Sequence, residues 1–183
     1  MIDCMKDLMS DKYFKTTFSP LELEDPDSHM KVSITGLPKN GLIICIPTGV
    51  HLSIVKDKIK GGAFNYKQSC DKLILIPTNR DINAYFIEMK KTFSFDNMSQ
   101  REKACNQILG TIPILDYLIS MVKLHFGKQC RVKKYYFVII AEKRMLRLNK
   151  GNVKARTREK NQYKNRNFKI IYSSKTIPFI HLQ

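Results

Sequence analysis

The chain has 183 residues, enough for one domain with a single sizeable core, and 43% of them are hydrophobic while 26% are charged. These fractions exclude a disordered chain. The chain carries 32 Lys and Arg residues against 16 Asp and Glu residues, a formal net charge of +16. This imbalance predicts attraction to polyanions, either nucleic acid or an acidic membrane surface.

Cysteine spacing and the N-terminal residues indicate a reduced, cytoplasmic protein. The first residues lack a basic segment followed by an apolar run, so we expect no secretory signal. No apolar run is long enough to cross a bilayer, and we expect no membrane partner. The five cysteines are far apart and never form Cys-x-x-Cys, which argues against disulfide frameworks and zinc sites: they are Cys4, Cys45, Cys70, Cys105 and Cys130.

The first quarter of the chain predicts one short helix and two strands. Residues 2–14 form an amphipathic pattern, and residues 19–27 are acidic and interrupted by two prolines, which indicates a connector. Residues 32–35 and 42–46 are typical of strands. The turn-rich residues 36–41 between them predict a hairpin-like linker.

Two apolar strands follow, at residues 70–76 and 84–90, separated by a polar turn that predicts an antiparallel hairpin. The first strand begins with Asp71, and the second ends with Glu88-Met89-Lys90. Because strand side chains alternate between faces, Glu88 and Lys90 lie on one side and Met89 on the other. A charged pair at the end of an apolar strand is costly near a core unless something uses it.

The next segment predicts a long helix. Ser99 and Glu102 have the spacing of a capping box. Gly110 and Pro113 predict that the helix is kinked or split, and we expect it to end near Gly127. Its core-facing stripe comprises Ala104, Ile108, Ile112, Leu115, Ile119 and Val122.

The apolar run at residues 135–141 predicts a central strand buried on both faces. Further strands are expected at residues 168–172 and 177–182. The order strand, strand, helix, strand predicts an α/β or α+β mixed sheet with a helix across one face. We therefore expect a single domain over residues 1–183, with a core of about residues 30–141 and terminal strands within residues 168–182.

Residues 143–169 contain eleven Lys and Arg residues and one acidic residue, and hence ten of the sixteen net positive charges. Such a run predicts an internal loop that contacts phosphate groups of nucleic acid. A solvated surface loop is the alternative. The candidate nucleic-acid contacts in and near this loop are Arg144, Arg147, Lys150, Lys154, Arg156, Arg158 and Lys160.

Asp71, Glu88 and Lys90 together have the composition that holds a hard divalent cation beside a phosphodiester. Their placement resembles the PD-(D/E)xK nuclease superfamily, which has the restriction-endonuclease-like fold. The Lys-x-x-x-Gln pattern of Lys103 and Gln107 in the following helix resembles a motif of some branches. The resemblance covers about residues 60–141, and Cys70 stands where the motif usually has proline.

This resemblance implies a restriction-endonuclease-like core and a nuclease that depends on Mg²⁺ or Mn²⁺. Asp71, Glu88 and the backbone carbonyl of Met89 would bind the metal, and Lys90 would contact the scissile phosphate or orient the attacking water. Gln107 would position that water or a metal ligand, while Lys103 touches phosphate. DNA is favoured over RNA, a role in prokaryotic defence or restriction follows by analogy, and a homodimer or a partner subunit is expected.

Two other functions remain open. The chain can be a non-catalytic nucleic-acid-binding module that stacks bases on Tyr135, Tyr163 and Phe168. It can also be a structural subunit whose basic loop docks on an acidic protein.

The site residues have plainer interpretations as well. Glu88 and Lys90 can be a solvated pair on an edge strand, and Gln107 a helix-surface residue. An extra acidic residue of the nuclease site, seen in part of the superfamily, has Glu22 or Glu24 as its candidates.

Overall fold

The computed structural model describes residues 2–10, 13–25, 29–45, 69–79, 81–144, 161–172 and 176–183. The described elements are α1 (Ile2–Leu8), β1 (Phe14–Thr16), β2 (Leu21–Asp25), β3 (Met30–Thr35), β4 (Leu42–Ile44), β5 (Lys72–Pro77), β6 (Ile82–Phe93), α2 (Met98–Gly110), α3 (Ile112–Phe126), β7 (Val132–Arg144), β8 (Gln162–Tyr163), β9 (Arg166–Tyr172), β10 (Thr176–Pro178) and the 3₁₀ helix η3 (Phe179–Leu182).

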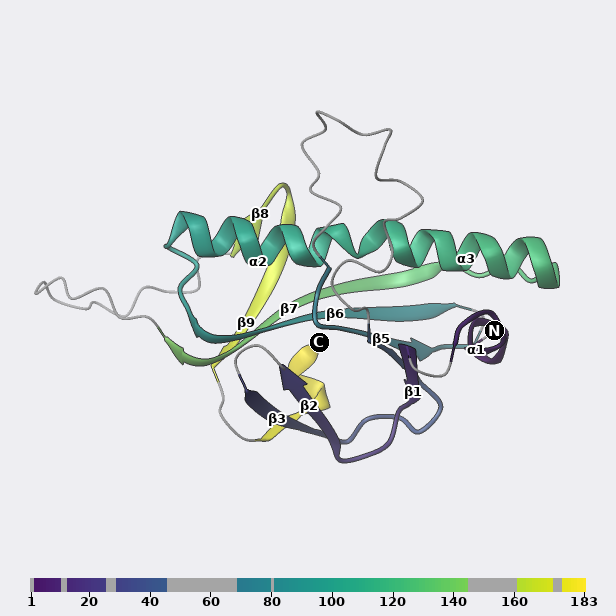
Figure 1. Ribbon diagram of the computed structural model, residues 1–183, viewed down its shortest axis with the longest axis horizontal. Helices are drawn as coiled ribbons and strands as arrows, with labels where there is room; N and C mark the ends of the chain where they lie inside the picture. Colours follow the sequence, from purple (N-terminus) through teal and green to yellow (C-terminus); the bar gives the residue numbers. More distant parts are fainter. Residues whose placement is uncertain are drawn as a thin grey trace, which may run out of the picture.

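A seven-stranded mixed sheet forms the centre of the molecule, with the strand order β1-β4-β5-β6-β7-β9-β8. Neighbouring strands from β1 through β6 are antiparallel, β6, β7 and β9 run parallel, and β8 and β9 form an antiparallel hairpin. Helices α2 and α3 provide the crossover between the parallel strands β6 and β7, as parallel pairs require. They lie end to end along the sheet (Figure 1).

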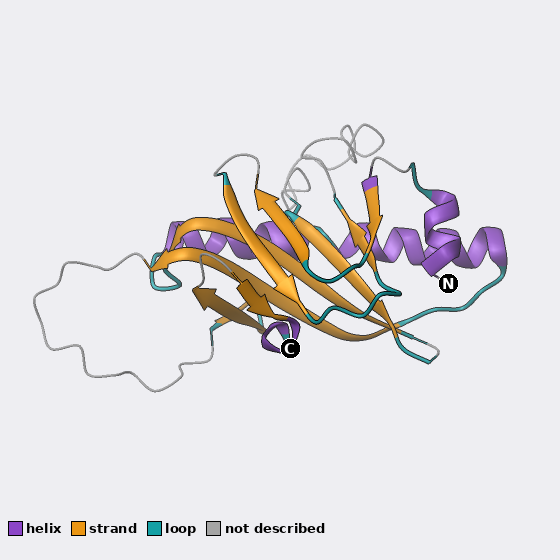
Figure 2. Ribbon diagram, turned by 90° about the horizontal axis from the view of Figure 1, so that it is seen from below, coloured by secondary structure: helices purple, strands orange, loops and turns teal. Residues whose placement is uncertain are grey.

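Different layers cover the two faces of this sheet. Helices α1, α2 and α3 cover one face, and a small sheet with the order β10-β3-β2 covers the other, together with η3 (Figure 2). Alternation along β6 divides its side chains between the two cores. Ala84 and Phe86 pack on the helix side, whereas Tyr85, Ile87 and Met89 pack on the side of the small sheet.

The two strands that carry the candidate site differ in length, and this difference positions the site. β5 pairs with β6 only from Ile82 to Ile87, whereas β7 pairs with β6 as far as Phe93. Asp71 immediately precedes β5. The second half of β6 therefore extends beyond the first residue of β5, and Asp71 lies at this edge of the paired region.

The predicted fold class is confirmed as a mixed α/β sheet flanked by helices. The antiparallel hairpin of β5 and β6 is also confirmed. The predicted helix is split at Thr111 into α2 and α3, and it ends at Gly127, which adopts a left-handed conformation with φ of 63°.

Two predictions for the first quarter of the chain were wrong. Residues 21–25 form strand β2, because their apolar and acidic residues alternate and both prolines lie outside the strand. The strands β3 and β4 do not form a hairpin. β3 pairs with β2 and β10, whereas β4 pairs with β1 and β5, so residues 36–41 connect two layers.

Three boundaries in the second half also differ from prediction. The cap of α2 is Asn97, whose side chain accepts a hydrogen bond from the Gln100 N–H at 3.1 Å, so Ser99 lies inside the helix. The end of the basic segment, from residue 162, forms the hairpin of β8 and β9. At the C-terminus, only β10 is a strand, and η3 follows it.

Candidate active site

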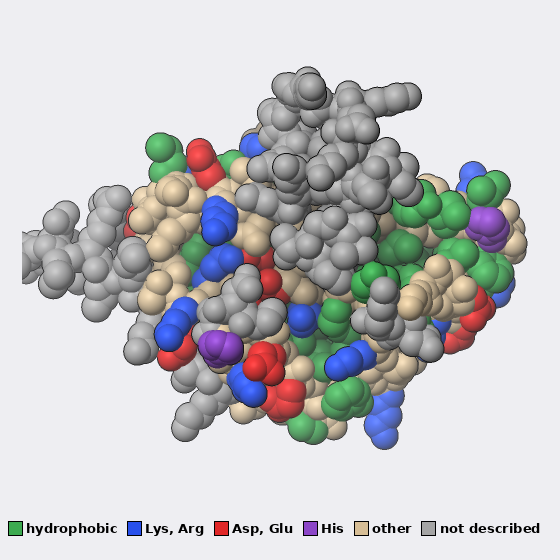
Figure 3. Space-filling view, in the orientation of Figure 1, with side chains coloured by type: hydrophobic (Ala, Val, Ile, Leu, Met, Phe, Trp, Pro, Cys, Tyr) green, Lys and Arg blue, Asp and Glu red, His purple; other side chains and the backbone are tan. Residues whose placement is uncertain are grey.

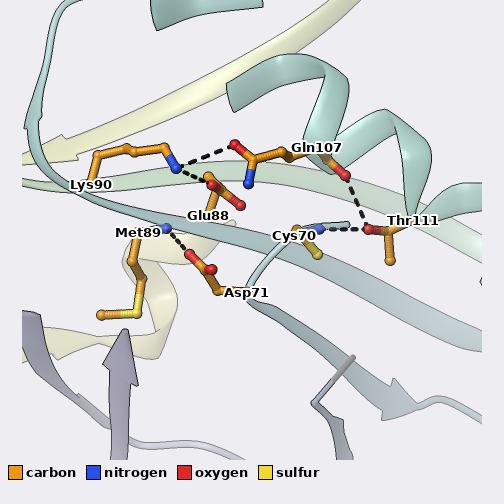
Figure 4. Close-up of polar contacts among 7 residues, drawn as sticks. All are labelled: Cys70, Asp71, Glu88, Met89, Lys90, Gln107 and Thr111. Carbon is orange, nitrogen blue, oxygen red and sulfur yellow. Dashed lines mark hydrogen bonds and ion pairs between the residues drawn. The ribbon is translucent and has the colours of Figure 1, made fainter. Parts of the chain in front are cut away.

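Strand β6, the residue before β5 and helix α2 together bring the main sequence-predicted site residues into one cluster. Glu88, Met89 and Lys90 follow each other on β6, Asp71 lies at the start of β5, and Gln107 reaches down from α2 (Figure 4). Figure 4 shows the Lys90 side chain reaching between Glu88 and Gln107, while the Asp71 carboxylate points to the main chain of Met89.

Asp71 is anchored to the backbone of β6. Its Oδ2 accepts a hydrogen bond of 2.6 Å from the Met89 N–H, two residues beyond Ile87, where pairing with β5 ends. The carboxylate thus satisfies a main-chain donor that the shorter strand leaves without a ladder partner. Burial raises the pKa of Asp71, the Met89 N–H and Lys90 lower it, and the charge of Asp25 raises it.

Glu88 is fully buried on the helix side of β6, although it is a charged residue type. Its Oε1 forms an ion pair with Lys90, and its Oε2 is buried without a hydrogen-bond partner. Burial, followed by the nearby charge of Asp71, raises the pKa of Glu88 to about 8, and Lys90 acts in the opposite direction. Glu88 is therefore not one half of a solvated surface pair, and its burial favours the neutral form of its carboxyl group.

Lys90 and Gln107 complete the cluster on the helix side. The Lys90 side chain is 26% exposed, so its ammonium group lies within reach of solvent. Its Nζ donates a hydrogen bond of 3.3 Å to Oε1 of Gln107. Gln107 is therefore a member of the cluster and not a plain helix-surface residue.

Thr111, which sequence analysis did not select, ties the helix to the strand. Its hydroxyl donates to the main-chain carbonyl of Gln107 at 3.1 Å and accepts from the Cys70 N–H at 2.8 Å. Thr111 is fully buried at the junction of α2 and α3. It links the helix turn that carries Gln107 to the residue before Asp71, and its only sequence signal was its position between Gly110 and Pro113.

The small sheet contributes an acidic residue that the sequence did not single out. Glu22 and Glu24, the candidates for an extra acidic residue, are exposed on β2. Asp25, at the end of the same strand, is buried, and its charge raises the pKa of Asp71. Because these residues were expected to form a connector, their strand alternation, which places Asp25 on the buried side, was not predicted.

The basic candidates are not part of this cluster as far as the structure describes them. Lys103 is exposed on α2. Arg144 is the last residue of β7, and its side chain is not among those that the structure describes. The remaining candidates also lie outside the described residues: Arg147, Lys150, Lys154, Arg156, Arg158 and Lys160.

The described residues were compared with the requirements of a metal site and of a membrane-spanning helix. It contains no group of three or more His, Cys, Asp or Glu side chains arranged to hold a metal ion. The stretch Met98–Phe126, which comprises α2 and α3, is long and apolar enough to cross a bilayer, but core helices of soluble proteins pass the same test. This stretch packs on the central sheet and supplies Gln107 and Thr111 to the cluster.

The chain matches no protein-family model, and no curated protein or solved structure is significantly similar to it.

Proposed function

We propose that this chain is a metal-dependent nuclease of the PD-(D/E)xK type, which hydrolyses phosphodiester bonds and favours DNA. One observation carries the proposal. Glu88 is completely buried, its Oε2 has no hydrogen-bond partner, and it lies beside the Asp71 carboxylate and Lys90. A carboxyl group that is buried without full hydrogen bonding lowers the stability of the fold. Buried groups with shifted pKa values are concentrated at functional sites.

A hard divalent cation fits this donor set. Positive charge between Asp71 and Glu88 would favour the ionised form of both carboxyl groups and would provide a partner for Oε2 of Glu88. The main-chain carbonyl of Met89 points to the same side of β6 as its N–H, toward Asp71. Asp71, Glu88 and this carbonyl would hold Mg²⁺ or Mn²⁺, with the remaining oxygens from water and substrate, as is usual for Mg²⁺.

Each residue of the cluster would have a separate role in phosphodiester hydrolysis. When bound, the cation supplies a water of lowered pKa and neutralises negative charge on the phosphate. Asp71 keeps its carboxylate in place through the Met89 N–H. Lys90, which is partly exposed, would present its ammonium group to a phosphate oxygen, while its hydrogen bond to the Gln107 side chain keeps that group near Glu88.

The hairpin of β8 and β9 supports nucleic acid as the substrate. Lys164 lies 5.3 Å from the ring centroid of Tyr163, and Arg166 lies 5.9 Å from that of Phe137. Asn106 accepts hydrogen bonds of 3.2 Å from Tyr163 and Lys164, which fixes the hairpin beside α2. Basic side chains beside a partly exposed aromatic ring, here Lys164 beside Tyr163, are typical of surfaces that bind single strands.

The same hairpin favours one alternative function, a nucleic-acid-binding module without catalytic activity. Such a module needs the basic and aromatic surface but has no need of Glu88. The two functions therefore differ in the role of the buried carboxyl group, and substitution of that group separates them.

The decisive experiment incubates the purified chain with plasmid, linear duplex DNA, single-stranded DNA and RNA, in Mg²⁺, Mn²⁺ or EDTA. We expect cleavage only with metal. The Asp71→Asn, Glu88→Gln and Lys90→Ala variants should each reduce the cleavage rate about 100-fold or more. The matched control is Glu102→Gln, a change of an exposed carboxylate on α2.

Two outcomes would contradict the nuclease proposal. Cleavage that survives Glu88→Gln at the rate of the unmodified chain would indicate a different catalytic site or a contaminant. Salt-sensitive binding without cleavage, on every substrate and metal tested, would favour the binding module.

A further inference from the structure

Helix α3 has one face in the core and an apolar face in solvent. Leu115 and Val122 are fully buried against the sheet. On the outer side, Tyr117 is 60% exposed and Leu124 is 75% exposed. Figure 3 shows hydrophobic side chains gathered at the right-hand end of the molecule, over the C-terminal half of α3. An apolar stripe of this kind on a helix surface marks an interaction site.

The spacing of the outer face is that of a helix-pairing seam. Pro113, Tyr117, Ser120 and Leu124 are exposed and follow each other at intervals of four, three and four residues. These are the intervals of the a and d positions of a heptad repeat. Small and large residues also alternate between these positions, so a bulky side chain on one helix can pack over a small one on the other.

The charged residues beside this seam indicate the orientation in which a second α3 helix can pair with it. Asp116 and Lys123 are exposed, lie seven residues apart and flank the seam on one side. In an antiparallel pair of two α3 helices, Tyr117 lies opposite Ser120 of the second copy. Asp116 then lies beside Lys123 of the second copy, and the twofold axis repeats this contact. In a parallel pair, Asp116 would lie beside Met121 instead, without a charged partner.

We propose that a second copy of this chain docks on the outer face of α3, through an antiparallel helix pair related by a twofold axis. The charge pattern and the alternation of residue size are both self-complementary, which is what an interface between identical surfaces requires. The pair involves about three helical turns and buries less than the roughly 800 Å² per partner of a standard interface. We therefore expect a weak dimer that dissociates on dilution. The proposal does not depend on the nuclease activity.

Sedimentation of the full chain over a concentration series, at moderate salt and without nucleic acid, tests this dimer. We expect a reversible monomer–dimer equilibrium. The single variants Asp116→Lys and Lys123→Asp each place two like charges side by side at both copies of this contact. Each should weaken the dimer about tenfold. The double variant Asp116→Lys with Lys123→Asp restores both pairs and should return the dissociation constant to within about threefold of the unmodified value.

Two further variants complete the test. Leu124→Glu places a charge in the seam and should leave the chain monomeric, with an unchanged circular-dichroism spectrum because Leu124 is exposed. The control Lys39→Asp makes the same charge change as Lys123→Asp, at an exposed residue of the 36–41 connection, and should leave the dimer intact.

Three outcomes would overturn the proposal. One is a chain that remains monomeric at all concentrations up to about 1 mM. Another is a double charge variant as weak as the single variants, because the antiparallel contact would then be absent. The third is a monomeric chain that binds vesicles of anionic lipid, with binding lost in Leu124→Glu, which would assign the apolar face to a membrane surface.

Discussion

The two halves of β6 differ sharply although they belong to one strand. From Ile82 to Ile87, the strand is paired on both sides, by β5 and by β7, and nearly all its side chains are apolar and buried. From Glu88 onward, the strand is paired with β7 but no longer with β5, and charged residues begin at once. The difference teaches that the candidate site is created by a missing neighbour. Beyond the first residue of β5, a main-chain donor of β6 lacks a strand partner, and Asp71 accepts its hydrogen bond.

The strongest test compares two side chains on the same face of β6. Phe86 is fully buried and packs against the rings of Tyr135 and Phe137. We expect Phe86→Ala to lower the free energy of unfolding by about 3–5 kcal/mol, because it leaves a cavity. Glu88→Gln, two residues further on, should not lower it at pH 7, since the amide retains most of the packing and does not have to take up a proton on folding. Urea denaturation measures both. Equal losses would mean that Glu88 serves the core and not a site.

The next prediction concerns the pH dependence of stability without metal. Glu88 has a pKa of about 8 in the folded chain and 4.5 as its ordinary value. Between these values, the folded state binds a proton that the unfolded state has lost, so stability falls as the pH rises from 4.5 to 8. The raised pKa of Asp71 acts in the same direction. We expect Glu88 to contribute a fall of about 4 kcal/mol, which Glu88→Gln removes. Thermal unfolding in EDTA at several pH values measures it, with Glu102→Gln as the control that keeps the slope.

Addition of metal should stabilise the folded chain through the carboxyl groups beside the second half of β6. At a concentration 100 times its dissociation constant, Mg²⁺ or Mn²⁺ should stabilise the chain by about 2.7 kcal/mol. Differential scanning fluorimetry at pH 7 and constant ionic strength would detect this rise in melting temperature. Asp71→Asn and Glu88→Gln should abolish the rise. If both variants kept it, the metal would bind elsewhere.

The smallest expected effect comes from the link between α2 and Asp71. Thr111→Val keeps the shape of the side chain but leaves the buried Cys70 N–H without its acceptor, at a cost of about 1 kcal/mol. Because Thr111 also holds the turn that carries Gln107, we expect a several-fold fall in the cleavage rate as well. Thr16→Val is the matched control, since it makes the same change at an exposed position on β1. A loss of stability with no change in rate would limit Thr111 to a structural role.

Sequence reasoning found the parts of the site that depend on local patterns. The apolar runs around Asp71 and Glu88 predicted the hairpin of β5 and β6, and Gly110 with Pro113 predicted the split helix. Strand alternation also placed Glu88 and Lys90 on one face. These features involve residues close in sequence, for which periodicity and turn residues are sufficient signals.

The features that sequence reasoning missed depend on contacts between distant parts of the chain. β10 pairs in parallel with β3, although the two strands lie near opposite ends of the chain, and no local pattern encodes that pairing. The small sheet that results turns Asp25 inward. The complete burial of Glu88 depends on α2 covering β6, so the sequence alone left a solvated pair open.

The hydrogen bond from the Met89 N–H to Asp71 gives the site a built-in spectroscopic reporter. An amide proton that points at a carboxylate resonates at a position that depends on the charge of that carboxylate. Protonation of Asp71, or a cation bound to it, should therefore shift the Met89 cross-peak in a nitrogen–proton correlation spectrum. The peak of Tyr85, in the half of β6 that is paired on both sides, should stay in place. Ligand binding at this site can thus be followed on an inactive variant such as Lys90→Ala, without any cleavage assay.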